Sequence, residues 1–323
     1  MVIIMVKNKF KILIVTEKWC DGNQEFGVSN NFHNLMGSLK SSGLNVQILT
    51  LHCDEIFQKH QKHIDMFLPE VYKKIKPDLV ITSFLGTSWM NPNKNTFSIL
   101  KEMDAKLCFM WPDTGYDWAI NSINNLGDVA DLHVSWGSDY REHNFLDRHL
   151  WLWAPQDERM YYNQEDKKIT ASFIGSTRGY KDRRMYLDYA LEKQIDLLIL
   201  GGQREGRLTP FEYAEHIRDS KIGINFPESP SGIDQCKGRV IEIISCGSML
   251  LERKNEATRK NLTPGEDYVE FEGLDDFVEK INFYTKNHKE RERIAKNGYQ
   301  KYCNNFSSSK FWTKVLTRCG YEL

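Results

Sequence analysis

Short apolar runs alternate with longer amphipathic segments along the whole chain. The runs of the first half have the length and β-rich composition of strands, and they occupy residues 11–16, 45–50, 78–84, 106–111 and 131–136. Between the first two, apolar residues recur at helical spacing from Phe32 to Leu39, and Gly43 follows at the position of a helix C-cap glycine. Strands that alternate with helices in this way predict a parallel, doubly wound sheet.

The alternation restarts after a polar and aromatic connector at 151–168. The expected strands of this second series are 170–175, 195–202, 221–226, 248–252 and 267–273, with helices at about 181–193, 210–219 and 237–246 and a mostly helical tail from Leu274. We therefore predict an α/β protein of two Rossmann-like domains, 1–155 and 156–323, which face each other across a cleft. The segment "FSSSKFW" predicts that the last helix, about 307–319, packs back onto the N-terminal domain.

Composition narrows the functional classes. The 323 residues are 41% hydrophobic and 27% charged with a net charge of −1, so the whole-protein field favours neither nucleic acid nor an anionic membrane. Lysines interrupt the apolar start, and no apolar run approaches the roughly 20 residues that span a bilayer. The 7 scattered cysteines include no Cys-x-x-Cys pair, which favours a reducing, cytoplasmic setting.

Common cofactor motifs are absent from the sequence. Neither half contains G-x-G-x-x-G or a P-loop, so a standard dinucleotide or P-loop site is not expected. The 9 histidines do not cluster with cysteines at ligand spacing, and "HQKH" at 60–63 is more typical of a solvated helix face than of a metal site. We expect no metal and no cofactor.

A basic turn follows the first strand of the second series. In "FIGSTRGYKDRR" the strand ends at Gly175 and Ser176, and a helix begins about six residues later. Four cations crowd this turn: Arg178, Lys181, Arg183 and Arg184. Backbone N–H groups at a helix start, together with cations, form a site for phosphate oxygens. A solvated basic turn is the alternative.

One carboxylate, Glu242, lies inside an otherwise apolar helix. Lys237 and Arg239 stand near the start of this helix, and Asp234 precedes Glu242 with seven residues between them. A carboxylate on a first helical turn can accept two hydroxyl hydrogen bonds, as a ribose diol offers. The alternative is a solvated Arg–Glu pair on the helix surface, against which the isoleucines beside Glu242 argue.

These residues resemble a known family. The stretch "DQCKGRVIE" followed by "IISCGSMLLE" is similar to the Glu-x7-Glu region of retaining glycosyltransferases of family 4, and closer still to the spore-maturation glycosyltransferase group. The segments "FIGS", "LTPFEYAEHIRDSKIGINFP" and "LTPGEDYVEFEGLDDFVEKINF" resemble other parts of the same family. The similarity covers roughly 165–318, and the N-terminal half shares only the general shape.

The resemblance implies a GT-B fold in which the C-terminal domain binds a nucleotide-diphosphate sugar. Glu242 would hold the ribose hydroxyls, and Asp234, one methylene shorter than the usual Glu, would face the donor sugar. The diphosphate would be neutralised by Arg178 and Lys181, or alternatively by Lys237 and Arg239. The remaining residues predicted to bind the donor are Gly27 (in a loop with Gly22 that resembles the family's glycine loop), Gly175, Ser176, Gly202 and Asn225.

The N-terminal half should bind the acceptor. In "MWPDTGYDW", Asp113, Tyr116 and Asp117 follow a strand, where an acid beside aromatic rings suits sugar binding, although Asp113 could equally cap the next helix. Asp113 would orient the acceptor hydroxyl if the reaction retains configuration, and Asp113 or Asp117 would be the general base if it inverts.

We therefore expect a hexosyl or related transferase. Its acceptor is left open among three classes: a glycan, a protein side chain or a modified DNA base. The alternatives are an epimerase or phosphorylase on the same fold and a non-catalytic sugar-binding or assembly protein. The sequence does not indicate an oligomeric state.

Overall fold

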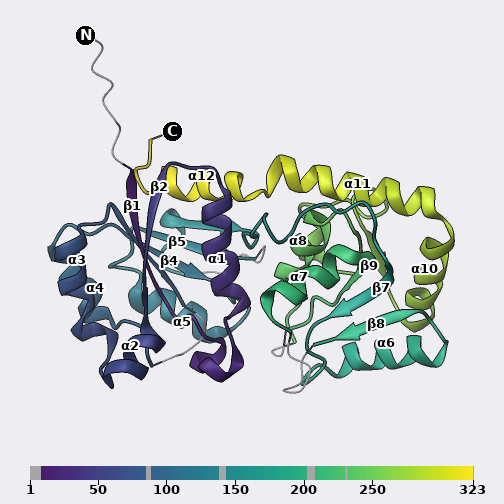
Figure 1. Ribbon diagram of the computed structural model, residues 1–323, viewed down its shortest axis with the longest axis horizontal. Coiled ribbons are helices and arrows are strands. Elements are labelled where there is room, and N and C mark those ends of the chain that lie inside the picture. The colour runs from purple at the N-terminus through teal and green to yellow at the C-terminus, as the bar shows by residue number, and fades with distance from the viewer. Residues whose placement is uncertain (1–8, 85–88, 138–142, 202–207, 230–231, 323) are drawn as a thin grey trace, which may run out of the picture.

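The protein is described here by a computed structural model, which covers residues 9–84, 89–137, 143–201, 208–229 and 232–322 (Figure 1). Two separate parallel sheets form two α/β domains, which confirms the predicted fold class. Within these residues, no helix combines the length and apolarity needed to cross a membrane.

The N-terminal sheet has the strand order β2-β1-β3-β4-β5-β6, and all its pairings are parallel. Its strands are β1 (Phe10–Thr16), β2 (Val46–His52), β3 (Leu79–Ser83), β4 (Leu107–Trp111), β5 (Leu132–Trp136) and β6 (His149–Leu152). The helices around it are α1 (Asn30–Ser41), α2 (Cys53–His60), α3 (Leu68–Ile75), α4 (Lys94–Glu102) and α5 (Asp117–Leu126), with short 3-10 turns η1 (Cys20–Gly22), η2 (Gln24–Phe26), η3 (Ile64–Met66) and η4 (Leu146–Arg148).

Strand β6 was not predicted, because part of it was assigned to the connector at 151–168. Its four residues include a histidine and a tryptophan, which do not form a recognisable apolar run. The strand is stabilised by parallel pairing with β5, in which His149 lies opposite His133.

The C-terminal sheet has the order β11-β10-β9-β7-β8 and is also parallel. Its strands are β7 (Ile169–Ile174), β8 (Leu197–Leu200), β9 (Ser220–Asn225), β10 (Met249–Arg253) and β11 (Val269–Phe271). Its helices are α6 (Lys181–Glu192), α7 (Pro210–Asp219), α8 (Gly238–Ser245), α9 (Glu256–Arg259), α10 (Leu274–Lys286) and α11 (His288–Asn305), and α12 (Ser308–Arg318) ends the chain.

Alternation along the strands buries both faces of each sheet. In β1, Leu13 and Val15 belong to one apolar cluster and Ile12 and Ile14 to another, because successive side chains point to opposite faces. Local signals set the helix ends: Thr209 and the side chain of the third helical residue form a capping box at the start of α7. Because all strands of each sheet are parallel, their carboxyl ends, and the loops after them, lie along one edge of that sheet.

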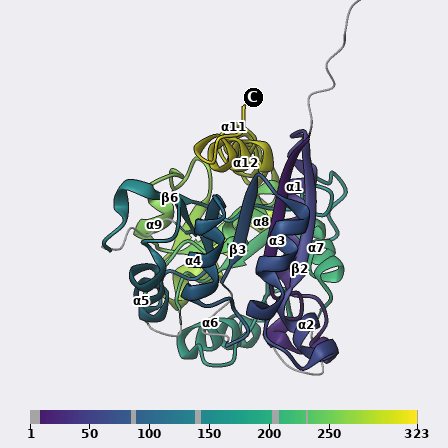
Figure 2. The same ribbon diagram turned by 90° about the vertical axis from the view of Figure 1, so that its left-hand side faces the viewer.

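The last two helices connect the domains. Helix α11 runs along the C-terminal domain and α12 continues over the N-terminal domain on the same side of the molecule (Figures 1 and 2). The Trp312 side chain is fully buried in the apolar cluster that contains Ile12 and Ile14 of β1, and its indole N–H donates to the Ser38 hydroxyl at 2.9 Å. Burial of a tryptophan at this position attaches the C-terminal tail firmly to the N-terminal core.

Candidate functional site

Arg239 links the carboxyl ends of two strands of the C-terminal sheet. Its guanidinium donates to the Ile174 carbonyl at the end of β7 at 2.8 Å and to the Asn225 side chain at the end of β9 at 2.9 Å. The Asn225 amide in turn donates to the buried Glu252 carboxylate of β10 at 2.7 Å. Arg239 and Asn225, both predicted to bind the donor, therefore also hold the strand ends together.

Gly175 lies directly against this guanidinium. Its φ is +157°, and a Cβ added there would lie only 2.2 Å from one terminal nitrogen of Arg239. Its N–H donates to the Leu200 carbonyl at 2.8 Å, which keeps the loop after β7 close to β8. A glycine at this position leaves space for the arginine.

Glu242 is buried at the contact between the domains, with 6% of its surface exposed. One carboxylate oxygen accepts from the Tyr213 hydroxyl of α7 at 2.8 Å, and the other accepts from the Asn34 amide of α1, in the N-terminal domain, at 3.4 Å. Burial raises the pKa of Glu242, while the bond from Tyr213 and the charge of Arg239 oppose that rise. The alternative of a solvated surface ion pair is therefore wrong.

Lys237 and Asp113 bring opposite charges to the two sides of the interface. Lys237 is the N-cap of α8, and Asp113 follows β4. Burial lowers the pKa of Lys237 to about 8 although the Asp113 charge opposes this, and burial raises the pKa of Asp113 although Lys237 opposes that. Nearby, a Cβ on Gly115 would lie 2.3 Å from the Gln235 amide oxygen, so the two loops are in contact.

Tyr116, three residues after Asp113, lies near the same contact between the two domains. Burial, and then the charges of Asp113 and Tyr180, raise the pKa of the Tyr116 hydroxyl to about 12. Asp117 begins α5 and is exposed. The structure thus brings Asp113 and Tyr116 to the interface, whereas Asp117 lies at the solvent-exposed start of its helix.

The basic turn after β7 contains cations in two different environments. The Arg178 side chain is exposed, and its backbone N–H donates to the Ser176 hydroxyl at 3.1 Å. Arg183 is 3% exposed, with its guanidinium 3.7 Å from the centre of the Tyr180 ring and bonded to the Ser176 carbonyl. Arg178 is therefore available to a ligand, whereas Arg183 supports the turn.

Asp234 lies at a cavity of about 440 Å³ beyond the carboxyl ends of β10 and β11. Its carboxylate accepts from the Arg253 guanidinium at 2.8 Å, and the other terminal nitrogen of Arg253 reaches Asp182 of α6 at 3.4 Å. Lys254 and Lys260 also line this cavity. Asp234 and Glu242, eight positions apart, therefore have different partners and different surroundings.

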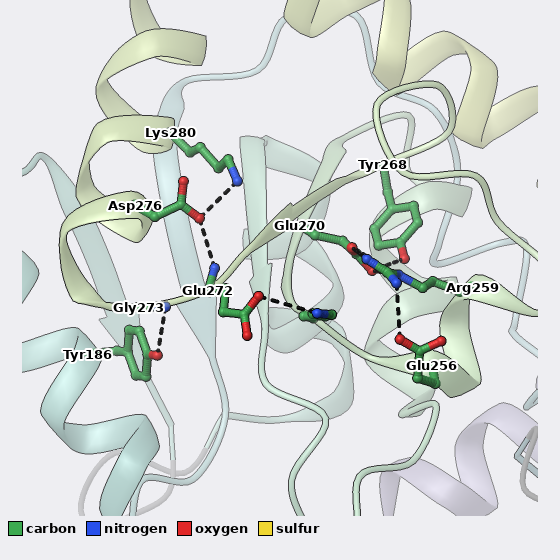
Figure 3. Close-up of polar contacts among 10 residues, drawn as sticks. Tyr186, Glu256, Arg259, Tyr268, Glu270, Glu272, Gly273, Asp276 and Lys280 are labelled. Carbon is green, nitrogen blue, oxygen red and sulfur yellow. Dashed lines mark hydrogen bonds and ion pairs between the residues drawn. The ribbon is translucent and has the colours of Figure 1, made fainter.

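The wall of this cavity is braced by ion pairs (Figure 3). Lys254 contacts Glu272 at 3.3 Å, and Arg259 contacts Glu256 at 3.0 Å. The Tyr186 hydroxyl accepts the backbone N–H that follows Glu272 at 3.2 Å. The cavity is thus bordered by charged groups whose positions are set by their neighbours.

Two of the predicted donor residues cannot be placed fully. Gly202 and the side chain of Lys181 lie outside the described residues, although the backbone of Lys181 begins α6. Gly27, in contrast, has a φ of +76° and open space where a Cβ would be, and its carbonyl accepts the Cys20 N–H at 2.9 Å. This bond closes the loop after β1.

Several residues of this region escaped the sequence analysis. Asn34 and Tyr213, which bind Glu242, lie on other helices, and no local pattern connects them to it. Arg253 and Glu252 did offer a signal, because charges at the end of a buried strand in "MLLER" are unusual. In the described parts of the chain, no group of three or more His, Cys, Asp or Glu side chains is arranged to hold a metal.

Comparisons with known proteins agree on the fold. Residues 167–317 match the model of a family described as "Glycosyl transferase-like", and no curated protein matches the chain. The protein HepE from Anabaena, solved with UDP and glucose, is 9% identical with a TM-score of 0.59, over 95% of this chain and 99% of that one. The fold is GT-B.

Two further solved structures have the same architecture. A glycosyltransferase from Rickettsia africae is 12% identical with a TM-score of 0.62, covering 97% of this chain and 98% of its own. A sucrose-phosphate synthase from Thermosynechococcus elongatus is 10% identical with a TM-score of 0.64, covering 96% of this chain and 98% of its own. At such low identity these similarities establish the GT-B fold alone.

The contact between Gly175 and Arg239 generates a stability prediction. Gly175→Ala should lower the free energy of unfolding by about 1–3 kcal/mol, because the new methyl group displaces the guanidinium and the backbone is strained. Gly179→Ala is the matched control: its φ of +82° is also unfavourable, but a Cβ there meets no neighbour within 4 Å. Urea denaturation measures both, and equal losses would mean that the Arg239 contact contributes nothing.

Proposed function

We propose that the protein transfers a sugar from a nucleotide-diphosphate sugar to a hydroxyl group of an acceptor. The match of residues 167–317 and the GT-B fold support this proposal. The observation that carries it is the contact between the loop after β4 and the loop before α8, where a Cβ on Gly115 would lie 2.3 Å from the Gln235 amide oxygen and the charges of Asp113 and Lys237 interact. Ligands of open parallel sheets bind at these ends.

Lys237 and Arg178 are the residues we assign to the diphosphate. Lys237 caps α8 and Arg178 lies just before α6, so each cation is close to the N-terminal end of a helix dipole. Lys237 is partly shielded from water, which strengthens its attraction to an anion. Arg239 acts in this proposal by adding positive charge from a fixed position between the strand ends. The developing charge on the leaving diphosphate is then stabilised without a metal.

Glu242 is assigned to the ribose of the nucleotide. A carboxylate offers about four acceptor positions, and the described residues Tyr213 and Asn34 use one on each oxygen. The Asn34 bond is long, at 3.4 Å, and a ribose hydroxyl can replace it. Asp234 is assigned to the donor sugar, which we take to be a hexose; Arg253 sets the position of its carboxylate beside the 440 Å³ cavity.

Asp113 is assigned to the acceptor hydroxyl. We propose that configuration is retained, as in family 4, so that the departing phosphate takes the acceptor proton and Asp113 only orients the hydroxyl. Burial raises its pKa, and the neighbouring Lys237 favours its ionised, hydrogen-bond-accepting form. We place the protein in a reducing, cytoplasmic location, since no disulfide joins any of its seven cysteines.

Incubation of the protein with single nucleotide sugars tests the proposed activity. We expect slow release of free sugar and nucleoside diphosphate from one donor, because many glycosyltransferases slowly hydrolyse their donor when no acceptor is present. Mass spectrometry and chromatography of the products make the measurement. Release from no donor would support the non-catalytic binder, and an epimerised donor with no release would support the epimerase.

Replacing Glu242 by Gln should weaken donor binding. The amide keeps the shape but loses the charge, so charge-assisted bonds to the ribose diol are lost and affinity falls by about 1–3 kcal/mol, or roughly 5- to 150-fold. Calorimetric titration with the nucleotide sugar measures the change, and a melting scan controls for folding. The matched variant Asn34→Ala removes a contact of the carboxylate without changing its charge and should bind the donor almost normally. Normal binding by Glu242→Gln would remove Glu242 from the site.

Donor affinity should fall as pH rises through about 8, the pKa of Lys237. The ammonium group, which attracts the diphosphate, is present below that pH and is lost above it. A bound diphosphate favours the ammonium form and therefore raises the pKa of Lys237. Above about pH 8 the dissociation constant should thus rise by up to about tenfold per pH unit. Lys237→Arg keeps its charge and should remove the pH dependence. Titrations of UDP at pH 7, 8 and 9 measure the effect, with uridine as the phosphate-free control. An unchanged UDP affinity between pH 7 and 9 would show that Lys237 does not contact the diphosphate.

A further inference from the structure

Trp89 exposes 60% of its surface, yet its position is tightly set. The Phe57 ring from α2 packs perpendicular to the Trp89 ring, with 4.5 Å between ring centres and 89° between planes. The His63 side chain bonds to the Trp89 backbone carbonyl through Nε2 at 2.7 Å. An exposed indole held in this way presents a flat apolar face to solvent without the freedom of a surface loop.

A second layer of polar contacts supports this arrangement. The other ring nitrogen of His63 lies 2.7 Å from the Asp65 carboxylate, which also accepts from the backbone and side-chain nitrogens of Asn93 at 3.0 and 2.6 Å. Both nitrogens of His63 are therefore engaged, so the "HQKH" segment contributes structure here. Pre-organised aromatic side chains lose little conformational entropy when they bind a ligand.

The exposed Trp89 ring, which we call the aromatic platform, borders the loop that follows β1. A Cβ on Gly22 would come within 2.6 Å of the methyl group of Met90, the residue after Trp89, and the Gln58 amide donates to the Gly22 carbonyl at 3.3 Å. Since Thr16 and His52 pair at the ends of β1 and β2, this loop and α2 share the carboxyl edge of the sheet. In both views α2 lies at the end of the domain opposite α12 (Figures 1 and 2). Trp89 thus lies on the edge at which the proposed function places the acceptor.

The surroundings of the ring favour a carbohydrate. The C–H groups on one face of a sugar ring carry partial positive charge and stack on the negative face of an indole. The hydroxyl groups at the sugar edge need polar partners. The centre of the His63 ring lies 6.0 Å from that of the indole, and the Asp65 carboxylate lies 2.7 Å from the same histidine. A stable protein partner would instead bury about 800 Å² of the surface on each side.

A DNA acceptor fits this corner less well. A base can also stack on an indole, but a duplex requires many cations along its phosphates. The adjoining helix end offers Lys59 and Lys62, while the Asp65 carboxylate lies 2.7 Å from His63, the neighbour of the indole, and the chain has a net charge of −1. We propose that the acceptor is a glycan, one sugar ring of which stacks on Trp89; this rests on the proposed transferase function and selects among its acceptor classes.

Binding to a printed array of bacterial, plant and animal oligosaccharides tests this proposal with the fluorescently labelled full-length protein. The wild type should bind a restricted set of glycans, Trp89→Ala should bind them about tenfold more weakly, and Trp89→Phe should recover part of the loss. Phe211→Ala is the matched control, because Phe211 of α7 is also 60% exposed and lies in the other domain. Melting scans check that each variant folds.

The outcomes separate the platform from the transferase activity. Binding of no glycan, or equal binding by the wild type and Trp89→Ala, would overturn the proposal. Binding of a hydroxymethylated DNA duplex that is lost in Trp89→Ala would also overturn it, in favour of a DNA acceptor. If the wild type binds glycans through Trp89 but releases sugar from no donor, the transferase function fails while the carbohydrate platform stands.

Discussion

The hydrogen bonds of Arg239 determine where the functional groups of the C-terminal domain lie. A guanidinium that is partly withdrawn from water must satisfy its N–H groups, and it does so on the Ile174 carbonyl and the Asn225 side chain. These bonds fix the first turn of α8 against the ends of β7 and β9. Lys237 and Glu242, which flank Arg239 on this helix, then face the N-terminal domain, where their electrostatic and hydrogen-bond partners are Asp113 and Asn34.

The two domains are joined by contacts of contrasting character. The buried Trp312 of α12 provides an apolar attachment that water and small ligands cannot replace. Around α8 the contacts with the N-terminal domain are polar: the long bond from Asn34 to Glu242 and the electrostatic interaction of Lys237 with Asp113. A nucleotide with hydroxyl and phosphate groups can exchange with polar contacts at little cost, because it supplies equivalent hydrogen bonds and charges. In the proposed function, the same groups thus hold the domains together and receive the donor.

The sequence predicted the strand series and the burial of Glu242, because apolar periodicity and apolar neighbours are local properties of the chain. Strand β6 was missed since its residues, among them His149, look like a connector until β5 lies beside them. Tertiary contacts also determine which cations remain available: Arg183 and Arg239 look equivalent to Arg178 in sequence, but their guanidinium groups are bonded to backbone carbonyls. The contact of Asn34 with Glu242 joins residues 208 positions apart, and no local pattern reveals it.

A crystal structure of the protein with UDP and with its donor sugar tests the central claim most directly. The account predicts a diphosphate at the N-terminal ends of α6 and α8, within hydrogen-bond distance of the Lys237 ammonium, and a ribose on the Glu242 carboxylate. It also predicts that the Asn225 side chain remains on Arg239, since this contact belongs to the scaffold. A nucleotide bound elsewhere, such as in the cavity of about 700 Å³ lined by Lys167, Lys221 and Arg291, with Lys237 and Glu242 untouched, would contradict it.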